Sequence, residues 1–463
     1  MSVVGAIMTP HPPLIIPEVG RGQEKGIAAT VAAMEKAARF VNERGAETIV
    51  VISPHATVYA DYFHISPGRR AAGDFGRFGV PSVKVTAEYD EAFVHALSAL
   101  CETEGLAAGT AGERDAELDH GTMIPLYFIG RAAGEEMPKA VRIGISGLSV
   151  EEHYRLGMGI AKTAETLNRR VVIAASGDLS HKLKADGPYG LAPEGKVYDE
   201  KIMDVMGRGA FLELFGFPDA LCSSAAECGH RSFVTMAGCF DGMAVQAEKL
   251  SYEGPFGVGY GVCTFLSGKP DDTRRFLDAR QNAVRTQAAA KQTKEDAYVK
   301  LARQSFTAWV QRRERIQIPA GLPPEMTERR AGVFVSLHKA GQLRGCIGTI
   351  SPTQKNIAEE IIQNAISACA HDPRFSPVRP DELPAVECSV DVLGEAEDIQ
   401  TANELDVRRY GVIVSSGHRR GLLLPALDGV DTVEQQVDIA RRKAGISAGE
   451  PVSFQRFEVI RHH

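Results

Sequence analysis

The stretch Ile7-Met8-Thr9-Pro10-His11-Pro12-Pro13 places an imidazole just after a short apolar run, between prolines that restrict its backbone. A second stretch, Thr48-Ile49-Val50-Val51-Ile52-Ser53-Pro54-His55, repeats this arrangement, because a β-branched run stops at Ser-Pro and ends in a histidine. Uninterrupted apolar runs of this kind are typical of buried parallel strands. Two histidines that follow such strands predict a shared metal site.

The segment between these two runs predicts a helix. Apolar residues recur at helical spacing from Glu24 to Val41, namely Ile27, Val31, Met34, Ala38 and Val41. Strand, loop, helix and strand then form a βαβ unit, so the sheet is at least partly parallel. Ligands of such sheets collect outside the carboxyl ends of the strands, which is where both histidines fall.

The first 268 residues predict an α/β domain, a mixed and partly parallel sheet with flanking helices. Further strands are expected at 83–85, 141–145, 171–175 and 260–266. Helices are expected at 91–101, 123–129, 150–167 and 233–239. A strongly polar segment, 269–296, then reads as a partly helical linker.

Residues 297–463 predict a second, compact α+β domain. The chain of 463 residues exceeds the size at which a single core usually stops growing, roughly 250–300 residues. An amphipathic helix opens this domain and reaches Trp309, and another helix is expected at 357–369. Strands are expected at 332–337, 345–350, 387–393 and 411–415.

Composition and charge narrow the class of protein. A net charge of −7 and a pI near 6.0 argue against a nucleic-acid-binding surface, which needs clustered Lys and Arg. Eight cysteines without a CxxC pair indicate reduced thiols in a cytoplasmic protein. We expect no membrane partner, because neither a signal sequence nor an apolar stretch approaching about 18 residues is evident.

The segment Ser223–Ser232 brings a carboxylate, a thiol and an imidazole ahead of a small, apolar helical run. With His11 and His55, Glu227 would complete the two-histidine, one-carboxylate set of a non-haem Fe(II) enzyme, which leaves three coordination positions open. Cys228 competes for the same role, and a thiolate would favour copper or zinc. In a third interpretation, Glu227 only caps or salt-bridges the helix that begins beside it.

These motifs resemble the class III extradiol ring-cleaving dioxygenases of the LigB type, which include the Memo-like proteins. The resemblance covers residues 1 to about 268 and rests on Thr-Pro-His11-Pro-Pro, Ser-Pro-His55, Asp119-His120-Gly121, Ser176-Gly177-Asp178-Leu179-Ser180-His181 and Glu227-Cys228-Gly229. It implies Fe(II) held by His11, His55 and Glu227, with His181 as the acid/base residue and His120 contacting a substrate oxygen. In Memo-like relatives, a cysteine takes the third ligand position.

The second domain resembles the AMMECR family through Leu343-Arg344-Gly345-Cys346-Ile347-Gly348-Thr349, His371-Asp372-Pro373-Arg374-Phe375 and Tyr410-Gly411-Val412. Arg344 beside Cys346, between Gly345 and Gly348, indicates either a nucleophilic thiolate near a cation or an anion-binding turn of backbone donors. The alternative is a tight β-turn in which the glycines serve geometry and Cys346 is simply buried.

The two domains in one chain resemble the AmmeMemoRadiSam system protein A family, which implies a radical SAM protein as a possible partner. We expect an Fe(II)-dependent extradiol dioxygenase-like oxidoreductase that uses O₂ on a small aromatic or catechol-type compound. Another divalent metal or copper is the alternative cofactor. A non-catalytic Memo-type metal-binding or scaffold protein is the alternative function. Class III relatives often pair subunits at the mouth of the site, so a homo-oligomer is also expected.

Overall fold

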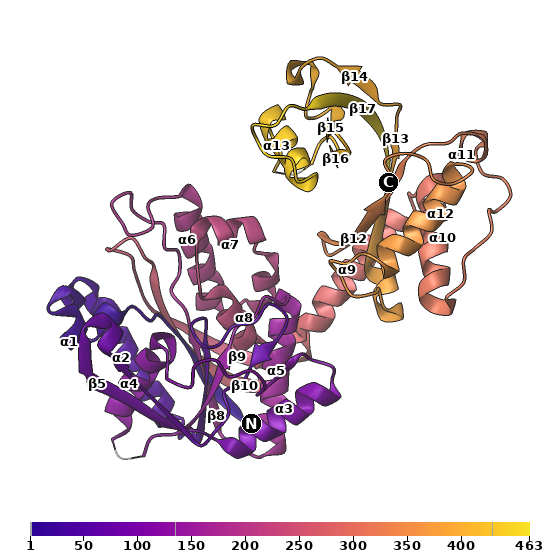
Figure 1. Ribbon diagram of the computed structural model, residues 1–463. Coiled ribbons are helices and arrows are strands. Elements are labelled where there is room, and N and C mark those ends of the chain that lie inside the picture. Colours follow the sequence, from indigo (N-terminus) through magenta and orange to yellow (C-terminus); the bar gives the residue numbers. More distant parts are fainter. Residues whose placement is uncertain (1, 135, 428) are drawn as a thin grey trace. The chain divides into compact units, whose positions relative to one another are not determined.

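The computed structural model describes residues 2–134, 136–427 and 429–463 (Figure 1). Contacts divide the chain into two compact units, Met1–Arg280 and Gln281–His463. This division falls inside helix α9 (Phe276–Gln292), which occupies most of the segment that the sequence predicts as a linker.

A six-stranded mixed sheet forms the centre of the first unit, in the order β7-β2-β8-β1-β10-β9. Strands β7, β2, β8 and β1 are parallel, and β10 and β9 continue the sheet antiparallel. The bounds are β1 (Val3–Thr9), β2 (Thr48–Ser53), β7 (Lys139–Gly144), β8 (Val171–Ser176), β9 (Met243–Glu253) and β10 (Tyr260–Pro270). The predicted α/β class is therefore confirmed, and β8 lies between the two strands that precede His11 and His55.

Both faces of this sheet are covered, which explains why β2 and β8 are buried at every position. Alternate residues of β2 belong to different cores, Val50 and Ile52 to one and Ile49 and Val51 to the other. Helices α3 (Glu91–Thr103), α5 (Val150–Thr166) and α8 (His230–Gly238) supply the first core. Helices α2 (Ala28–Glu43) and α4 (His120–Ala133) supply the second.

Smaller elements surround this sheet. The strand predicted at 83–85 exists, but it belongs to a separate hairpin of β4 (Arg70–Phe75) and β5 (Val80–Glu88). The other α-helices and strands that the structure describes here are α1 (Pro17–Gly20), β3 (Phe63–His64), β6 (Ala108–Gly109), α6 (Pro193–Arg208) and α7 (Asp219–Ala225), and short 3-10 helices connect some of these elements.

The second unit is an α+β domain built on an antiparallel sheet in the order β12-β11-β13-β17-β15-β16, with β14 beside β17. Its strands are β11 (Val333–Lys339), β12 (Gln342–Gly348), β13 (Val386–Leu393), β14 (Glu397–Ile399), β15 (Tyr410–Ser416), β16 (Arg419–Leu423) and β17 (Ser453–His462). Its other helices are α10 (Ala297–Arg312), α11 (Pro324–Glu328), α12 (Ile357–Ala370) and α13 (Val433–Lys443). Helices α10 and α12 share a core with Val333, Val335 and Leu337 of β11.

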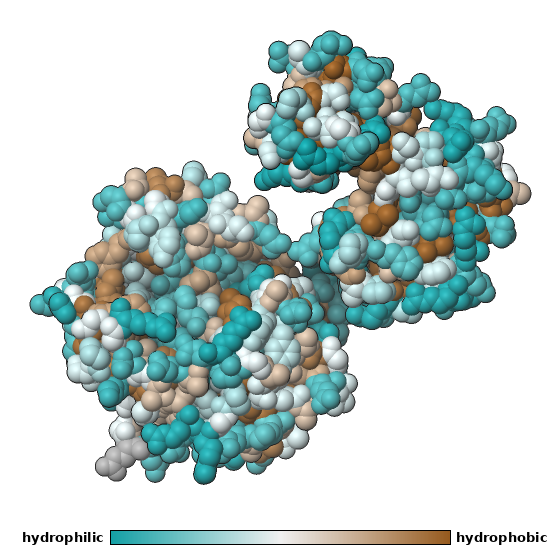
Figure 2. Space-filling view, in the orientation of Figure 1, coloured by the Kyte–Doolittle hydropathy of each residue, from teal (hydrophilic) through white to brown (hydrophobic). Residues whose placement is uncertain are grey.

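Polar residues cover most of the visible surface of both units, with apolar residues scattered among them (Figure 2). Within the described ranges, no helix combines the length and the apolar character that crossing a membrane requires.

Candidate metal centre

Three neighbouring parallel strands deliver the site residues to one edge of the first sheet. His11 follows β1, His55 follows β2, and the loop that contains Asp178 and His181 follows β8. Because parallel strands end at the same edge, the three loops meet there. His120, the first residue of α4, joins them from a fourth segment.

Three imidazoles converge at this edge. The ligand atoms of His11, His55 and His120 all lie within 4.8 Å of one another. The Nε2 atoms of His11 and His55 are 3.0 Å apart, and the rings of His55 and His120 lie with centroids at 4.2 Å. This cluster is compact enough to hold one metal ion. His120, which the resemblance assigns to substrate contact, thus lies among the predicted ligands.

Ser176, the last residue of β8, fixes the tautomer of His11. Its hydroxyl donates to the carbonyl of Gly121 at 2.6 Å, so its oxygen must accept from Nδ1–H of His11, at 2.9 Å. Nε2 of His11 therefore carries the lone pair and faces the other imidazoles. The backbone N–H of His11 donates to Asp178 at 2.7 Å, which fixes the same loop.

Asp119 ties the other two histidines together. Its carboxylate accepts from the hydroxyl of Ser53 at 2.6 Å and caps α4 through the N–H of Thr122 at 2.9 Å. The same Ser53 oxygen accepts from the N–H of His55 at 3.2 Å. The turn that carries His55 and the helix start that carries His120 are thus held by one carboxylate.

His11 is buried, His120 is half-buried and His55 is exposed, and the pKa of each imidazole lies below its ordinary value. Desolvation, reinforced by the charges of His55, His120 and His181, lowers the pKa of His11 well below its ordinary value. Desolvation and the neighbouring His55 lower the pKa of His120 to about 4. Neutral histidines retain the lone pairs that a metal ion needs, so the chemistry of the donor set fits a divalent cation.

Glu227 and Cys228 lie in the turn between α7 and α8. The carboxylate of Glu227 accepts from the N–H of His230 at 2.6 Å and so caps α8, and burial raises its pKa to about 7. The sulfur of Cys228, by contrast, lies 3.5 Å from Nε2 of His11. The structure thus places the thiol next to the histidines, and the identity of the third ligand stays a prediction.

Close backbone contact brings this turn to the site. A Cβ on Gly177 would overlap with the backbone of Gly229, so the two glycines allow the turn and the loop after β8 to touch. The N–H of Cys228 donates to the carbonyl of Asp178 at 3.3 Å. The turn is therefore fastened to the same loop that carries His181.

His181 is oriented by a backbone carbonyl. Its Nδ1 donates to the carbonyl of Ala226 at 2.6 Å, so Nε2 is left with the lone pair. Ala226 adopts a left-handed conformation, with φ of 52°, at the end of α7. Burial lowers the pKa of His181, so the ring is neutral and can accept a proton. Its assigned acid/base role stays a prediction.

The sequence did not single out Ser53 or Ser176 as site residues, nor the carbonyl of Ala226. A signal existed for Ser176, because a hydroxyl at the carboxyl end of an apolar parallel strand faces the same edge as the histidines. The role of Ala226 depends on a backbone conformation, which sequence periodicity does not reveal.

Residues 5–263 match the family described as the catalytic LigB subunit of aromatic ring-opening dioxygenase. The chain belongs to the LigB family. Residues 299–462 match the AMMECR1 family, so a LigB domain is fused to an AMMECR1 domain.

The chain is similar to a full-length relative, to a shorter relative and to two solved structures. A protein of Clostridium acetobutylicum is 41% identical over 470 residues, which cover 100% of this chain and 99% of the relative. A protein of Thermotoga maritima is 49% identical over 170 residues, which cover 36% of this chain and 98% of the relative. The crystal structure of uncharacterized protein PH0010 from Pyrococcus horikoshii is 30% identical, with coverages of 35% and 88% and a TM-score of 0.34. That of uncharacterized protein JW3007 from Escherichia coli K12 is 14% identical, with coverages of 57% and 99% and a TM-score of 0.38.

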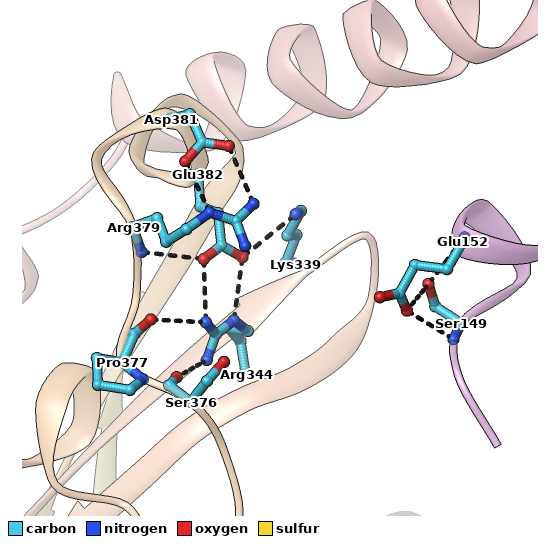
Figure 3. Close-up of polar contacts among 9 residues, drawn as sticks. All are labelled: Ser149, Glu152, Lys339, Arg344, Ser376, Pro377, Arg379, Asp381 and Glu382. Atoms are coloured by element: carbon cyan, nitrogen blue, oxygen red, sulfur yellow. Dashed lines mark hydrogen bonds and ion pairs between the residues drawn. The ribbon is translucent and has the colours of Figure 1, made fainter. Parts of the chain in front are cut away.

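In the AMMECR1 domain, Arg344 serves the structure of a neighbouring loop. Its guanidinium binds Glu382 at 3.0 and 3.1 Å and donates to the carbonyls of Ser376 and Pro377 (Figure 3). Lys339 adds a second cation to the same carboxylate, at 3.3 Å. Arg344 thus clamps the segment after α12 to β12.

The hexapeptide that contains Cys346 lies within β12, so its interpretation as a tight β-turn is wrong. Gly345 passes so close to α12 that a Cβ would overlap with the carbonyl of Ala368, and a Cβ on Gly348 would overlap with the ring of Phe334. The N–H of Cys346 donates to Asp372 at 2.8 Å, so it is not a free donor for an anion. Both glycines therefore serve close packing, while the half-buried thiol remains available for chemistry.

Proposed function

We propose that the LigB domain binds one divalent metal ion, Fe(II), and acts as a dioxygenase-like oxidoreductase on a small aromatic compound of the catechol type. The observation that carries this proposal is the convergence of three neutral imidazoles at the carboxyl edge of the sheet. Another divalent metal or copper would fit the same histidines if the thiol of Cys228 joins them.

His11 and His55 would hold the ion, with Cys228 or Glu227 as the third protein ligand. Once bound, the ion would supply a centre at which a catechol-type substrate and O₂ meet. The hydrogen bond from Nδ1 of His11 to Ser176 leaves Nε2 of His11 with the lone pair that would bind the ion. Asp119 would orient His55 indirectly, because its hydrogen bond to Ser53 holds the turn that carries His55.

His181 and His120 would handle the substrate. Nε2 of His181 carries a lone pair and can take the proton of a substrate hydroxyl, then return it as product forms. His120 is supported by the edge of the Phe78 ring, with centroids 5.5 Å apart, and would contact a substrate oxygen. Both rings are half-buried, so each is partly shielded from solvent.

A second candidate function is a Memo-type metal-binding or scaffold protein, which would bind metal without cleaving rings and would work with a radical SAM partner. The observation that favours it is the 3.5 Å approach of the Cys228 sulfur to His11, since a cysteine ligand is what the Memo-like resemblance implies. In either case the AMMECR1 domain would recognise or modify a substrate, product or partner, in the cytoplasm.

The test begins with protein purified without oxygen and loaded with Fe(II). We expect about one iron per chain by elemental analysis, and loss of that iron in a His11→Ala/His55→Ala double variant. His95→Ala, an exposed histidine on α3, is the matched control and should keep its iron. Full iron content in the double variant would rule out the proposed centre.

Adding air and a panel of catechols to the iron-loaded protein distinguishes the two candidate functions. A yellow ring-fission product that depends on His181 supports the dioxygenase-like activity. Tight iron binding with no consumption of O₂ by any catechol supports the Memo-type alternative.

A further inference from the structure

One face of the AMMECR1 sheet carries a row of polar side chains near Cys346. Ser336 on β11 lies opposite Cys346 on β12 and opposite Ser389 on β13, so the three share a face. Helices α10 and α12 pack against Val335 and Leu337, which point to the other face. Cys346, Ser336 and Ser389 are all partly exposed.

Donors and cations from three segments surround the thiol of Cys346. The hydroxyl of Ser336 donates to the sulfur at 3.2 Å. The guanidinium of Arg374 interacts with the thiol and also donates to the Cys346 carbonyl at 3.0 Å. Lys443, the last residue of α13, interacts electrostatically with both the thiol and Arg374. An anion placed at this sulfur would therefore meet the charge of Lys443 and that of Arg374, the latter partly offset by the Asp372 carboxylate.

The two cations differ in how they are held. Asp372 binds Arg374 through two hydrogen bonds, of 2.7 and 3.0 Å, and its carboxylate also accepts from the N–H of Cys346. Arg374 is thereby fixed beside the thiol, although its side chain is 54% exposed. Lys443 makes no hydrogen bond or ion pair with any residue that the structure describes. Its charge is thus available to a ligand.

We propose that Cys346 is a nucleophile for a small anionic carbon electrophile, whose negative group binds Arg374 and Lys443. The sulfur donates an electron pair to the electrophilic carbon and forms an S–C bond. The bond from that carbon to the leaving group breaks, the leaving group departs with its electron pair, and the thiol proton passes to solvent. Ser336 orients the sulfur. All residues of this site belong to the AMMECR1 domain.

Cys388 offers an internal control. It lies on the neighbouring strand β13 opposite Leu337, so its side chain points to the face that the helices cover. Burial raises the pKa of Cys388 to about 12. The native protein thus contains two cysteines on one sheet, and the cation that acts on Cys388, Arg303, is paired with Glu295 at 2.5 Å.

The experiment compares two electrophiles of nearly equal size, iodoacetate and iodoacetamide, which differ in charge. Alkylation of each cysteine of the full chain is followed by peptide mass spectrometry, with N-acetylcysteinamide as the free thiol. We expect Cys346 to react faster than Cys388. We also expect its rate ratio of iodoacetate to iodoacetamide to exceed that of the free thiol by about tenfold.

Variants test which residues make Cys346 react preferentially with the charged electrophile. Lys443→Met and Arg374→Met should each lower the rate ratio at Cys346, whereas Lys300→Met, an exposed cation on α10, should not. Lys443→Met removes no hydrogen bond, so it tests the proposal even if Arg374→Met unfolds the loop. Alkylation of Cys346 no faster than Cys388, or a ratio equal to that of the free thiol, overturns the proposal. So does an unchanged ratio in Lys443→Met.

Discussion

A single hydroxyl decides which nitrogen of His11 can bind a metal. Ser176 can accept from Nδ1 of His11 only because its own hydrogen is directed to the carbonyl of Gly121. Ser176→Ala removes this acceptor, and we expect the affinity for Co(II), measured by anaerobic titration, to fall by about 10- to 100-fold. Ser98→Ala, which removes a hydroxyl on α3, should leave the affinity unchanged. Equal affinities in both variants would contradict the tautomer argument.

Protein loaded with Co(II) can distinguish whether Glu227 or Cys228 is the third metal ligand. We expect the Co(II) form to show a thiolate charge-transfer band in the near ultraviolet, because the Cys228 sulfur lies 3.5 Å from His11. Cys228→Ala should abolish the band.

Glu227→Gln is the matched variant, since an amide oxygen can still cap α8 at the N–H of His230. We expect this variant to keep the band and to lose less than about 1 kcal/mol of stability. Loss of the metal itself in Glu227→Gln, with a normal fold, would instead identify the carboxylate as the ligand.

At the scale of one residue, the sequence predicts the chemistry better than the direction of a side chain. His11, His55 and His181 each follow an apolar strand, so their meeting was predictable from parallel-strand geometry. The choice between Glu227 and Cys228 was not, because adjacent residues point in different directions and the turn that carries them follows a left-handed residue, Ala226, which sequence periodicity does not reveal.

At the scale of elements, apolar strands were predicted well and half-exposed ones were missed. β2 and β8 are buried at every position and therefore read as continuous apolar runs. β9 is mostly exposed or half-buried and carries charges along its length, so no apolar run reveals it. The order of strands was also hidden, because β8 enters between β1 and β2 from more than a hundred residues away.

The packing of β12 on α12 gives a prediction about stability. Gly345→Ala places a methyl group against the carbonyl of Ala368, and we expect it to destabilise the AMMECR1 domain by about 1–3 kcal/mol. Gly449→Ala, in the same domain, meets open space and has an ordinary backbone conformation, so it should change stability by less than about 0.5 kcal/mol. Urea unfolding followed by circular dichroism measures both, and equal midpoints would argue against the tight contact.

At the scale of the whole molecule, each unit has its own core, and each contains a carboxyl group whose contribution to stability depends on pH in the opposite sense to that of the other. In the LigB domain, burial raises the pKa of Asp199 from 3.8 to about 7, against hydrogen bonds from Ser180 and Tyr252. A raised pKa means that the folded state prefers the protonated group. The stability this provides is complete below about pH 4 and is lost as the pH rises towards 7.

Glu382 in the AMMECR1 domain behaves in the opposite way. Burial alone would raise its pKa, but hydrogen bonds from Arg344 and the backbone of Arg379, with the charges of Arg344 and Lys339, lower it from 4.5 to about 2. The folded state thus prefers the ionised group. Its stabilising contribution is complete above about pH 4.5 and is lost as the pH falls towards 2.

Calorimetry of the full chain between pH 3 and 8 should therefore show two transitions, and variants of Asp199 and Glu382 isolate the contribution of each carboxyl group. Asp199→Asn keeps an acceptor for Ser180 but cannot ionise. In the native protein, ionisation of Asp199 should cost the LigB domain on the order of 3 kcal/mol of stability as the pH rises from 4 to 7. We expect this cost to be absent in Asp199→Asn, and the AMMECR1 transition to be unchanged. Glu382→Gln should lower the AMMECR1 transition at pH 6 by about 1 kcal/mol, since solvent screens part of the ion pair, and flatten its response to acid. A single transition that both variants shift alike would mean that the two units unfold as one cooperative body.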